Sequence, residues 1–346
     1  MWWLLVRLSV SGGLLAWLVH RINLGAILNN LAHASPWWVL WANVLTAPVI
    51  LLVSWKWQIL LRAAGVSESL PRLLRMNLVG GFYSLVLPGE ETGQLMKGLI
   101  LARHAKGDAV AASIVVDEIL GTLSIFTIAL GALALTHGFP LRAPIAGAIA
   151  LMLTLFLIAL FVALVPRFHG LARATVERPW LARVPRLDRP RARFAVWLAP
   201  FWDRLAGYRR EPGAMLAAFG ITVAAHLVAN VSVLSTMTAV QANVSFLDIC
   251  WVVAAISALV TIPITVSGFG VREGANVIIL GQLGVPPDRA LAVSLLAFAI
   301  GFIWSLPGAV LQFGIRAKAR AYPGAAPVGP ADAVAAGENA ASYTSR

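Results

Sequence analysis

Two short stretches decide the fold of this chain: Pro88-Gly-Glu-Glu-Thr-Gly93-Gln-Leu-Met-Lys97 and Pro263-Ile-Thr-Val-Ser-Gly268-Phe-Gly-Val-Arg272-Glu273. In both, a glycine follows the proline at the same spacing, and a basic residue follows that glycine at the same spacing. Each stretch lies between apolar runs. Helix breakers and charge are costly in lipid and are tolerated mainly where they line a cavity or a path. The sequence therefore predicts two related polar elements inside a membrane domain.

The composition is that of a polytopic membrane protein. The 346 residues are 59% hydrophobic and only 12% charged, which is about half the charged fraction of a soluble domain. The net charge is +12, and the arginines cluster between apolar segments and at the C-terminus. This is the positive-inside pattern of a cell (inner or plasma) membrane protein, so we expect membrane lipids as partners and no nucleic acid. The single cysteine, Cys250, cannot form an intrachain disulfide.

The apolar runs predict an all-α integral membrane protein. Six runs reach the roughly 20 residues that a transmembrane helix needs. They are Trp3–Val19, Trp37–Leu61, Ala109–Leu135, Ala143–Val165, Met215–Val240 and Ala290–Phe313. We interpret the first as an uncleaved span, because the small-residue pattern Ala32-His33-Ala34 lies too far beyond it for a signal peptidase site.

Two further apolar regions are interrupted and hold the two motifs. Met76–Leu101 is broken by Gly80-Gly81 and Pro88-Gly89, and Leu247–Leu283 is broken around Pro263 and Gly268. Basic residues flank both ends of the first region, so both ends read as cytoplasmic. These residues are Arg62, Arg72, Arg75, Lys97, Arg103 and Lys106. An element with both ends on one side is a re-entrant hairpin.

The remaining loops fix the other orientations. The loop Pro166–Pro212 carries eleven Arg against four acidic residues, and Arg316, Lys318 and Arg320 follow the last span. Both regions are predicted to be cytoplasmic, as are both termini, so the second hairpin enters from the exterior face. Six spans with two oppositely inserted hairpins form an inverted repeat, an arrangement common in secondary transporters. A pair of ordinary short spans in place of each hairpin is the alternative.

Residues 1–320 are expected to form one membrane domain, with a disordered tail over 321–346, which is rich in Ala, Gly and Pro. The Arg-rich loop 166–212 contains an aromatic and apolar face at helical spacing opposite a basic face. The apolar face comprises Phe194, Trp197, Leu198, Phe201, Trp202, Leu205 and Tyr208. This pattern favours a helix lying in the headgroup layer. A helix packed on the protein's own cytoplasmic end is the alternative.

The segment Asn77–Leu120 carries a more specific signal. Phe82-Tyr-Ser-Leu-Val-Leu-Pro88-Gly, Gly93-Gln-Leu-Met-Lys97 and Ala112-Ser113-Ile-Val-Val-Asp117 resemble the flippase-like transmembrane family, the membrane region of lysylphosphatidylglycerol synthases. In the second half, Ser267-Gly268-Phe-Gly270-Val-Arg272-Glu273 is similar to the Gly-x-Gly-x-Arg-Glu motif of that family, followed by Leu283-Gly-Val-Pro286. The resemblance covers nearly the whole chain outside the tail and the Arg-rich loop.

The resemblance implies lipid translocation or association with lipid or lipid-linked sugar pathways. Stand-alone family members include hopanoid-associated membrane proteins of similar length. The chain ends soon after its last span, so we expect no soluble aminoacyl-transferring domain. It also differs from the family pattern: Gln94 stands where an acid is expected, Glu118 stands where an arginine is expected, and the last span has no arginine near Ala297 or Phe298. These differences suggest a subgroup with different headgroup chemistry.

The predicted substrate site combines charges from both hairpins and one span. Lys97 and Arg272 are the leading contacts for an anionic headgroup, with helix N-termini as additional donors. Asp117 and Glu118 lie near the membrane midplane, face different neighbours on their helix, and one is expected to pair with a basic residue. Further candidates are Glu90, Glu91, Gly93, Gly268, Gly270 and Glu273.

Weaker candidates have simple structural explanations. Lys97 fits an interfacial anchor as well as a ligand. Asp117 and Glu118 also fit a static buried ion pair, and Glu90 and Glu91 fit a solvated cavity mouth as well as a cation site. A histidine in a span, His226, is more often hydrogen-bonded between helices than a proton relay.

No enzyme motif is visible, and we expect no cofactor and no metal. The sequence lacks a Walker A loop, a Cys/His cluster and a GxSxG motif. The first hypothesis is therefore a transporter that moves a polar or anionic lipid between leaflets by alternating access. The alternatives are a membrane-embedded lipid-modifying enzyme that uses Glu118, Glu273 or His226, and a non-transporting scaffold that binds lipid- or hopanoid-biosynthesis enzymes.

Overall fold

The computed structural model describes residue 13 and residues 24–87, 92–103, 105–136, 142–167, 200–260 and 270–321. Within these residues the regular structure is helical, as predicted. The elements are α2 (Leu24–Ala32), α3 (Pro36–Ala63), α4 (Leu70–Val86), α5 (Thr92–Ala102), α6 (Gly107–Leu135), α7 (Arg142–Leu164), η2 (Tyr208–Arg210), α10 (Pro212–Ala239), α11 (Phe246–Val260), α12 (Val271–Gly281) and α13 (Pro287–Ala321).

Five of the described helices are long and apolar enough to cross a membrane: α3, α6, α7, α10 and α13. They coincide with five of the six predicted spans, which are thereby confirmed. The sixth, Trp3–Val19, lies outside the described residues. Proline in the first turn starts several of these helices, as at Pro36 and Pro212. Proline suits this position, because the first N–H groups of a helix have no partner within it.

Four of the shorter helices, α4, α5, α11 and α12, make two pairs. The lengths are 17 residues for α4, 11 for α5, 15 for α11 and 11 for α12. A helix of 11 residues rises about 16 Å, roughly half of the hydrocarbon thickness. The predicted break at Gly80-Gly81 is wrong, since both glycines lie inside α4. Neither glycine ends α4, because the backbone remains helical at both positions. The lack of a side chain at Gly80 lets α5 pack closely against α4.

The pair α4–α5, called here the first hairpin, is antiparallel. A Cβ on Gly80 would lie 3.0 Å from the carbonyl oxygen of Gly93, and Lys97 Nζ donates to Asn77 Oδ1 at 3.1 Å. Because the residue numbers run in opposite directions across this contact, the outer ends of α4 and α5 lie at the same end of the pair. The side chains of Val110 and Ile114, near the start of α6, lie against Gly98 of α5.

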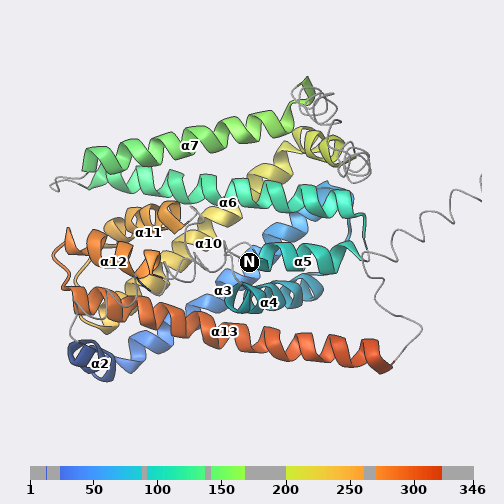
Figure 1. Cartoon of the computed structure of the whole chain (residues 1–346). Coiled ribbons are helices and arrows are strands. Elements are labelled where there is room, and N and C mark those ends of the chain that lie inside the picture. Colours follow the sequence, from blue (N-terminus) through green and yellow to red (C-terminus); the bar gives the residue numbers. More distant parts are fainter. Residues whose placement is uncertain are drawn as a thin grey trace, which may run out of the picture.

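The pair α11–α12, called here the second hairpin, lies beside the opposite end of α6. Its residues share one apolar cluster with Ala129 and Leu133, near the C-terminal end of α6. Figure 1 shows α4 and α5 beside one half of the long helices and α11 and α12 beside the other. Two oppositely placed helix pairs are what the predicted inverted repeat requires. The residues that connect each pair, 88–91 and 261–269, lie outside the described residues.

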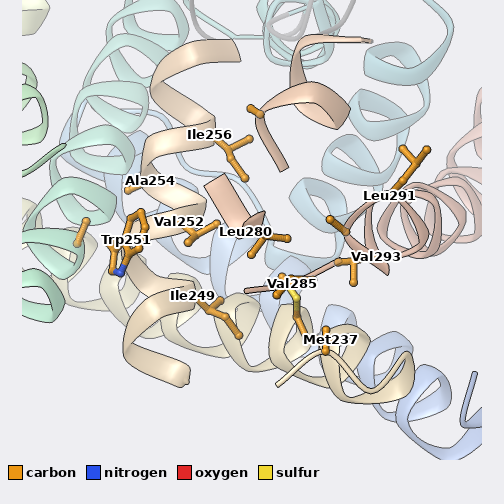
Figure 2. Close-up of a cluster of buried hydrophobic side chains, with 14 of the residues drawn as sticks. Met237, Ile249, Trp251, Val252, Ala254, Ile256, Leu280, Val285, Leu291 and Val293 are labelled. Atoms are coloured by element: carbon orange, nitrogen blue, oxygen red, sulfur yellow. The ribbon is translucent and has the colours of Figure 1, made fainter. Parts of the chain in front are cut away.

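Two apolar clusters pack the helices together, one around each hairpin. One surrounds the second hairpin, where Ile249, Trp251 and Val252 of α11 lie near Leu280 of α12 (Figure 2). The other surrounds the outer end of the first hairpin and contains Trp57, Leu60, Leu73 and Leu101, among other residues. Dispersion contacts and the satisfied helical backbone hold such clusters together in lipid.

The segment before α10 packs on the protein. The side chains of Leu205 and Tyr208 are buried in the second of these clusters. The Tyr208 hydroxyl donates to the carbonyl of Leu60 at 2.8 Å, and Arg204 Nε contacts Asp108 Oδ2 at 3.0 Å. Leu205 and Tyr208 therefore pack on the protein itself, as in the alternative to a helix that lies in the headgroup layer. Phe194, Trp197 and Leu198 lie outside the described residues.

Burial also makes this tyrosine a weaker acid. Burial raises the pKa of the Tyr208 phenol well above its ordinary value, and the charge of Asp117 raises it further. The phenol therefore keeps its proton and remains a hydrogen-bond donor to α3.

Candidate functional site

Lys97 lies in the interior of the protein. It is on α5, and only 2% of its surface is exposed. Its Nζ lies 3.9 Å from Asp117 Oδ2 on α6 and 4.5 Å from the centre of the Trp57 ring on α3. The ring face attracts the ammonium electrostatically. The burial shows that Lys97 is not an interfacial anchor with its head in water.

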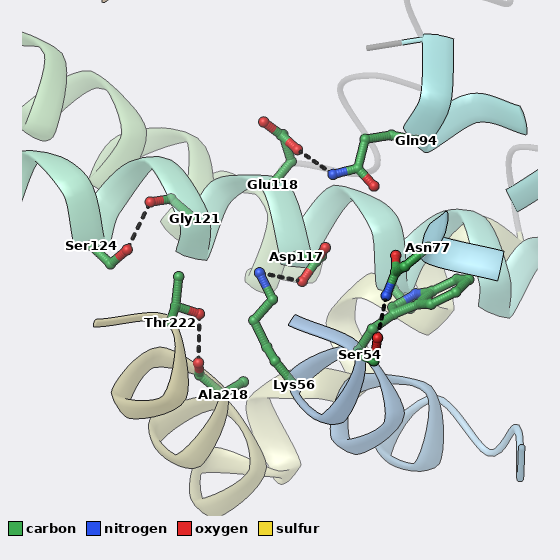
Figure 3. A network of polar contacts seen from close by, with 12 residues as sticks. Ser54, Lys56, Asn77, Gln94, Asp117, Glu118, Gly121, Ser124, Ala218 and Thr222 are labelled. Atoms are coloured by element: carbon green, nitrogen blue, oxygen red, sulfur yellow. Dashed lines mark hydrogen bonds and ion pairs between the residues drawn. The ribbon is translucent and has the colours of Figure 1, made fainter. Parts of the chain in front are cut away.

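A second lysine, which sequence reasoning missed, contacts the same carboxylate. Lys56 on α3 is also buried, and its Nζ lies 2.8 Å from Asp117 Oδ1 (Figure 3). The signal was present, because Lys56 stands inside the apolar run Trp37–Leu61, where a charge is rare and marks a function or a buried pair. The predicted pairing of an α6 carboxylate with Lys97 is thus found, but Lys56 makes the shorter contact.

The three ionisable groups carry a net charge of +1 when all are ionised, because two lysines share one carboxylate. Buried charges are costly unless they are paired and hydrogen-bonded. Asp117 therefore neutralises one cation fully and leaves the other only partly neutralised. The distances show which one: Lys56 is within direct ion-pair distance, and Lys97 is farther away.

Neutral polar side chains complete the surroundings of Lys97. Asn77 on α4 accepts a hydrogen bond from Lys97 and donates to Ser54 Oγ at 2.8 Å. Ser54 in turn donates to the carbonyl of Ile50, within α3. Trp57 is fixed by a hydrogen bond from its Nε1 to Ser113 Oγ at 3.2 Å. These contacts join α3, α4, α5 and α6 around one lysine.

Glu118 faces away from its neighbour Asp117. Figure 3 shows the two carboxylates on different sides of α6, as the roughly 100° step between successive helical residues requires. Gln94 Nε2 on α5 donates to Glu118 Oε2 at 3.4 Å. The two family positions at which this chain differs, 94 and 118, therefore contact each other.

A cavity of about 310 Å³ lies among α3, α4, α5 and α6. Its polar lining includes Lys97 and Glu118, and helix backbone is accessible at its glycines. The lining residues are Val49, Ile50, Val53, Asn77, Gly80, Gly81, Ser84, Gly93, Gln94, Lys97 and Glu118. A volume of this size lies at the lower end of the range for small-molecule sites. A headgroup fits such a space, whereas two acyl chains do not.

Gly93, a predicted site residue, lines the cavity and sets the spacing of α4 and α5. A Cβ at this position would overlap Ser84 Oγ and the carbonyl oxygen of Gly80. The absence of a side chain lets the two helices approach, as small residues do in membrane helix pairs. The consequence that the structure shows for Gly93 is therefore close packing, and its role in a substrate site stays a prediction.

The second motif lies on a different part of the molecule. Arg272 is half-buried in the first turn of α12. Glu273 is buried, and its Oε2 accepts a hydrogen bond from the backbone N–H of Gly270 at 2.6 Å. Gly270 has a φ of +84°, which glycine adopts without strain. Gly270 and Glu273 thus fix the start of α12, and Arg272 projects from a helix whose N-terminus they shape.

The other predicted residues fall into two groups. Glu90, Glu91 and Gly268 lie outside the described residues. His226 on α10 lies 2.7 Å, through its Nδ1, from Ser124 Oγ on α6. This is the predicted hydrogen bond between helices.

Comparisons with known proteins agree with this architecture. The family model described as "Lysylphosphatidylglycerol synthase TM region" matches residues 4–308. A relative from Methanothermobacter thermautotrophicus, named "UPF0104 membrane protein", is 24% identical over 300 residues, which cover 83% of this chain and 88% of the relative. No solved structure matches the chain. The narrower assignment to a hopanoid-associated subgroup stays a prediction. The extent of the family match shows that the chain belongs to the lysylphosphatidylglycerol synthase TM region family.

Proposed function

We propose that this protein moves a polar or anionic lipid between the leaflets of the cell membrane without changing it chemically. The observation that carries the proposal is the buried lysine pair around Asp117, beside a cavity that Lys97 lines. Charged groups at membrane depth in this kind of fold mark substrate or ion paths.

The surplus charge favours an anion at Lys97. If a headgroup phosphate enters the cavity and draws Lys97 away from Asp117, Lys56 still neutralises that carboxylate at 2.8 Å. The exchange replaces a long ion contact of Lys97 with a direct one and leaves no buried carboxylate unpaired. This matters because an uncompensated buried charge costs several kcal/mol.

The second hairpin supplies the opposite-facing site in this proposal. Arg272 projects from the first turn of α12, where backbone N–H groups and the positive end of the helix dipole favour a phosphate. Arginine also binds phosphate bidentately. The headgroup would contact Lys97 in one state and Arg272 in the other, as the two hairpins move relative to the long helices. The positive-inside pattern places both termini and the outer end of the first hairpin in the cytoplasm.

The test is the leaflet sidedness of labelled lipid in vesicles that contain the purified protein. Lys97→Met removes the proposed contact and should slow translocation at least about tenfold, equivalent to roughly 1.4 kcal/mol. Lys106→Met is the matched control, because Lys106 is an exposed lysine just before α6, and it should translocate at the wild-type rate.

Three outcomes would reject the proposal. A wild-type rate in Lys97→Met would show that the buried lysine does not serve the substrate. A lipid of altered mass after incubation would indicate a lipid-modifying enzyme. Intact protein that binds lipid but never changes its sidedness would favour a scaffold for lipid-biosynthesis enzymes.

A further inference from the structure

The cavity beside Lys97 also presents acceptors for a cation. Of the described residues that line it, two are ionisable: Lys97 on α5 and Glu118 on α6. We infer that the headgroup is zwitterionic, with a phosphate at Lys97 and a primary ammonium at Glu118 and Gln94. This inference rests on the proposed function and specifies the substrate class of the same site.

Glu118 lies on a different side of α6 from the carboxylate that the two lysines contact. Both lysines contact Asp117, which lies on a different face of α6 (Figure 3). Glu118 accepts a hydrogen bond from the neutral amide of Gln94, and this contact leaves the negative charge of the carboxylate in place. The cavity therefore has a positive and a negative side chain in its lining, which matches a headgroup that carries both signs.

Gln94 adds a second acceptor at the same place. Its Oε1 is buried and has no hydrogen-bond partner within the residues that the structure describes. A buried acceptor without a partner carries a desolvation cost that a donor from a ligand would remove. A primary ammonium has three N–H donors, so it can donate to Glu118 and to Gln94 Oε1 at once.

The chemistry of these acceptors distinguishes among common phospholipids. A quaternary ammonium such as choline carries charge but has no N–H, so it would satisfy Glu118 only electrostatically and leave Gln94 Oε1 without a donor. A phosphoglycerol headgroup carries hydroxyl donors but no positive charge to match Glu118. Phosphoethanolamine provides the phosphate, the charge and the donors together.

The test is a binding measurement on the full chain purified in detergent. The probes are short-chain phosphatidylethanolamine, phosphatidylcholine and phosphatidylglycerol with identical acyl chains. We expect the wild type to bind phosphatidylethanolamine about tenfold more tightly than the other two, a difference of roughly 1.4 kcal/mol. Equal affinities, or a preference for phosphatidylglycerol, would overturn the inference without any variant.

Two variants test whether Glu118 and Gln94 cause the preference for phosphatidylethanolamine. Glu118→Gln keeps the size of the side chain and an acceptor for Gln94, and it should remove most of the preference while phosphatidylglycerol affinity stays within about twofold. Gln94→Leu should reduce the preference severalfold. Glu68→Gln is the matched control, because Glu68 contacts Arg72 outside the cavity lining. If both cavity variants keep the full preference, the assignment is wrong.

The inference and the proposed function can fail separately. A wild type that translocates lipid but does not distinguish the three headgroups leaves the transporter intact and removes the substrate class. A wild type that prefers phosphatidylethanolamine in detergent but changes no lipid's sidedness in vesicles keeps the binding site and removes the transport function.

Discussion

Lys97 of the first hairpin and Arg272 of the second occupy the same place in their sequence motifs but have different surroundings. Lys97 is buried among Asp117, Asn77 and the Trp57 ring. Arg272 is half-buried at the start of α12, a helix that packs through Leu280 into an apolar cluster. The hairpin motif therefore determines the position of the basic residue in the sequence. The neighbouring long helices determine its burial and its contacts.

The difference follows from what α3 and α6 offer to each hairpin. Near the first hairpin they present Lys56, Ser54 and Asp117. Toward the C-terminal end of α6, the side chains of Phe126, Ala129 and Leu133 are part of the apolar cluster around the second hairpin. A transporter built from such halves would hold a charged headgroup mainly in the first half. The predictions below test this division of roles.

The orientation of the hairpins should give the largest effect, an all-or-none difference in labelling. In a Cys250→Ser background, we expect Ser69→Cys and Arg103→Cys, at the outer ends of the first hairpin, to react only from the cytoplasmic side. Asn243→Cys and Gln282→Cys, at the outer ends of the second, should react only from the exterior, and all four positions are exposed. The measurement is modification by a membrane-impermeant thiol reagent on intact and on opened cells. Opposite sidedness within either pair would show that its helices cross the membrane.

Removal of Asp117 should give the largest loss of stability. Asp117→Asn removes the carboxylate that the buried Lys56 and Lys97 both contact, and loss of one partner of a buried ion pair typically costs about 3–5 kcal/mol. The measurement is the free energy of unfolding in mixed micelles. Adding Lys56→Met to this variant should recover part of the loss, because it removes one of the stranded charges.

The second hairpin supplies the control for this variant. Asp248 of α11 accepts hydrogen bonds from Ser245 Oγ and Trp251 Nε1 near the start of its helix. Asp248→Asn should cost no more than about 1 kcal/mol, as expected for a helix start. If the two variants cost the same, Asp117 is not the centre of a buried network.

Much of this division was predictable from sequence. Hydrophobic length identified the described spans, because this signal is local and the cost of violating it in lipid is large. The assignment of the two sides from the loop arginines stays a prediction. The depth of Asp117 followed from its position in a run of apolar residues. Its separation from Glu118 followed from helical geometry.

The partners of these residues were not predictable in the same way. That Lys56 contacts Asp117, and that Gln94 contacts Glu118, depends on how α3 and α5 pack against α6, and one sequence contains no record of that packing. Glycine lowers helix propensity in water, but the prediction of a break at Gly80-Gly81 is wrong. In the protein the pair lies within α4, and the lack of a side chain at Gly80 admits α5.

The smallest effect should appear at the glycines of the two hairpins, and it should have opposite signs. Gly93→Ala places a methyl group on Ser84 Oγ and on the carbonyl of Gly80, and overpacking of this kind typically costs about 1–3 kcal/mol. Gly274 of α12 has no atom within 4 Å of the corresponding Cβ position, so Gly274→Ala should stabilise by up to about 1 kcal/mol through helix propensity alone. Unfolding in mixed micelles measures both. Equal destabilisation by the two substitutions would mean that the first hairpin is no more tightly packed at its glycine than the second. A loss confined to Gly93→Ala would tie the close approach of α4 and α5, and with it the cavity beside Lys97, to the absence of a side chain at Gly93.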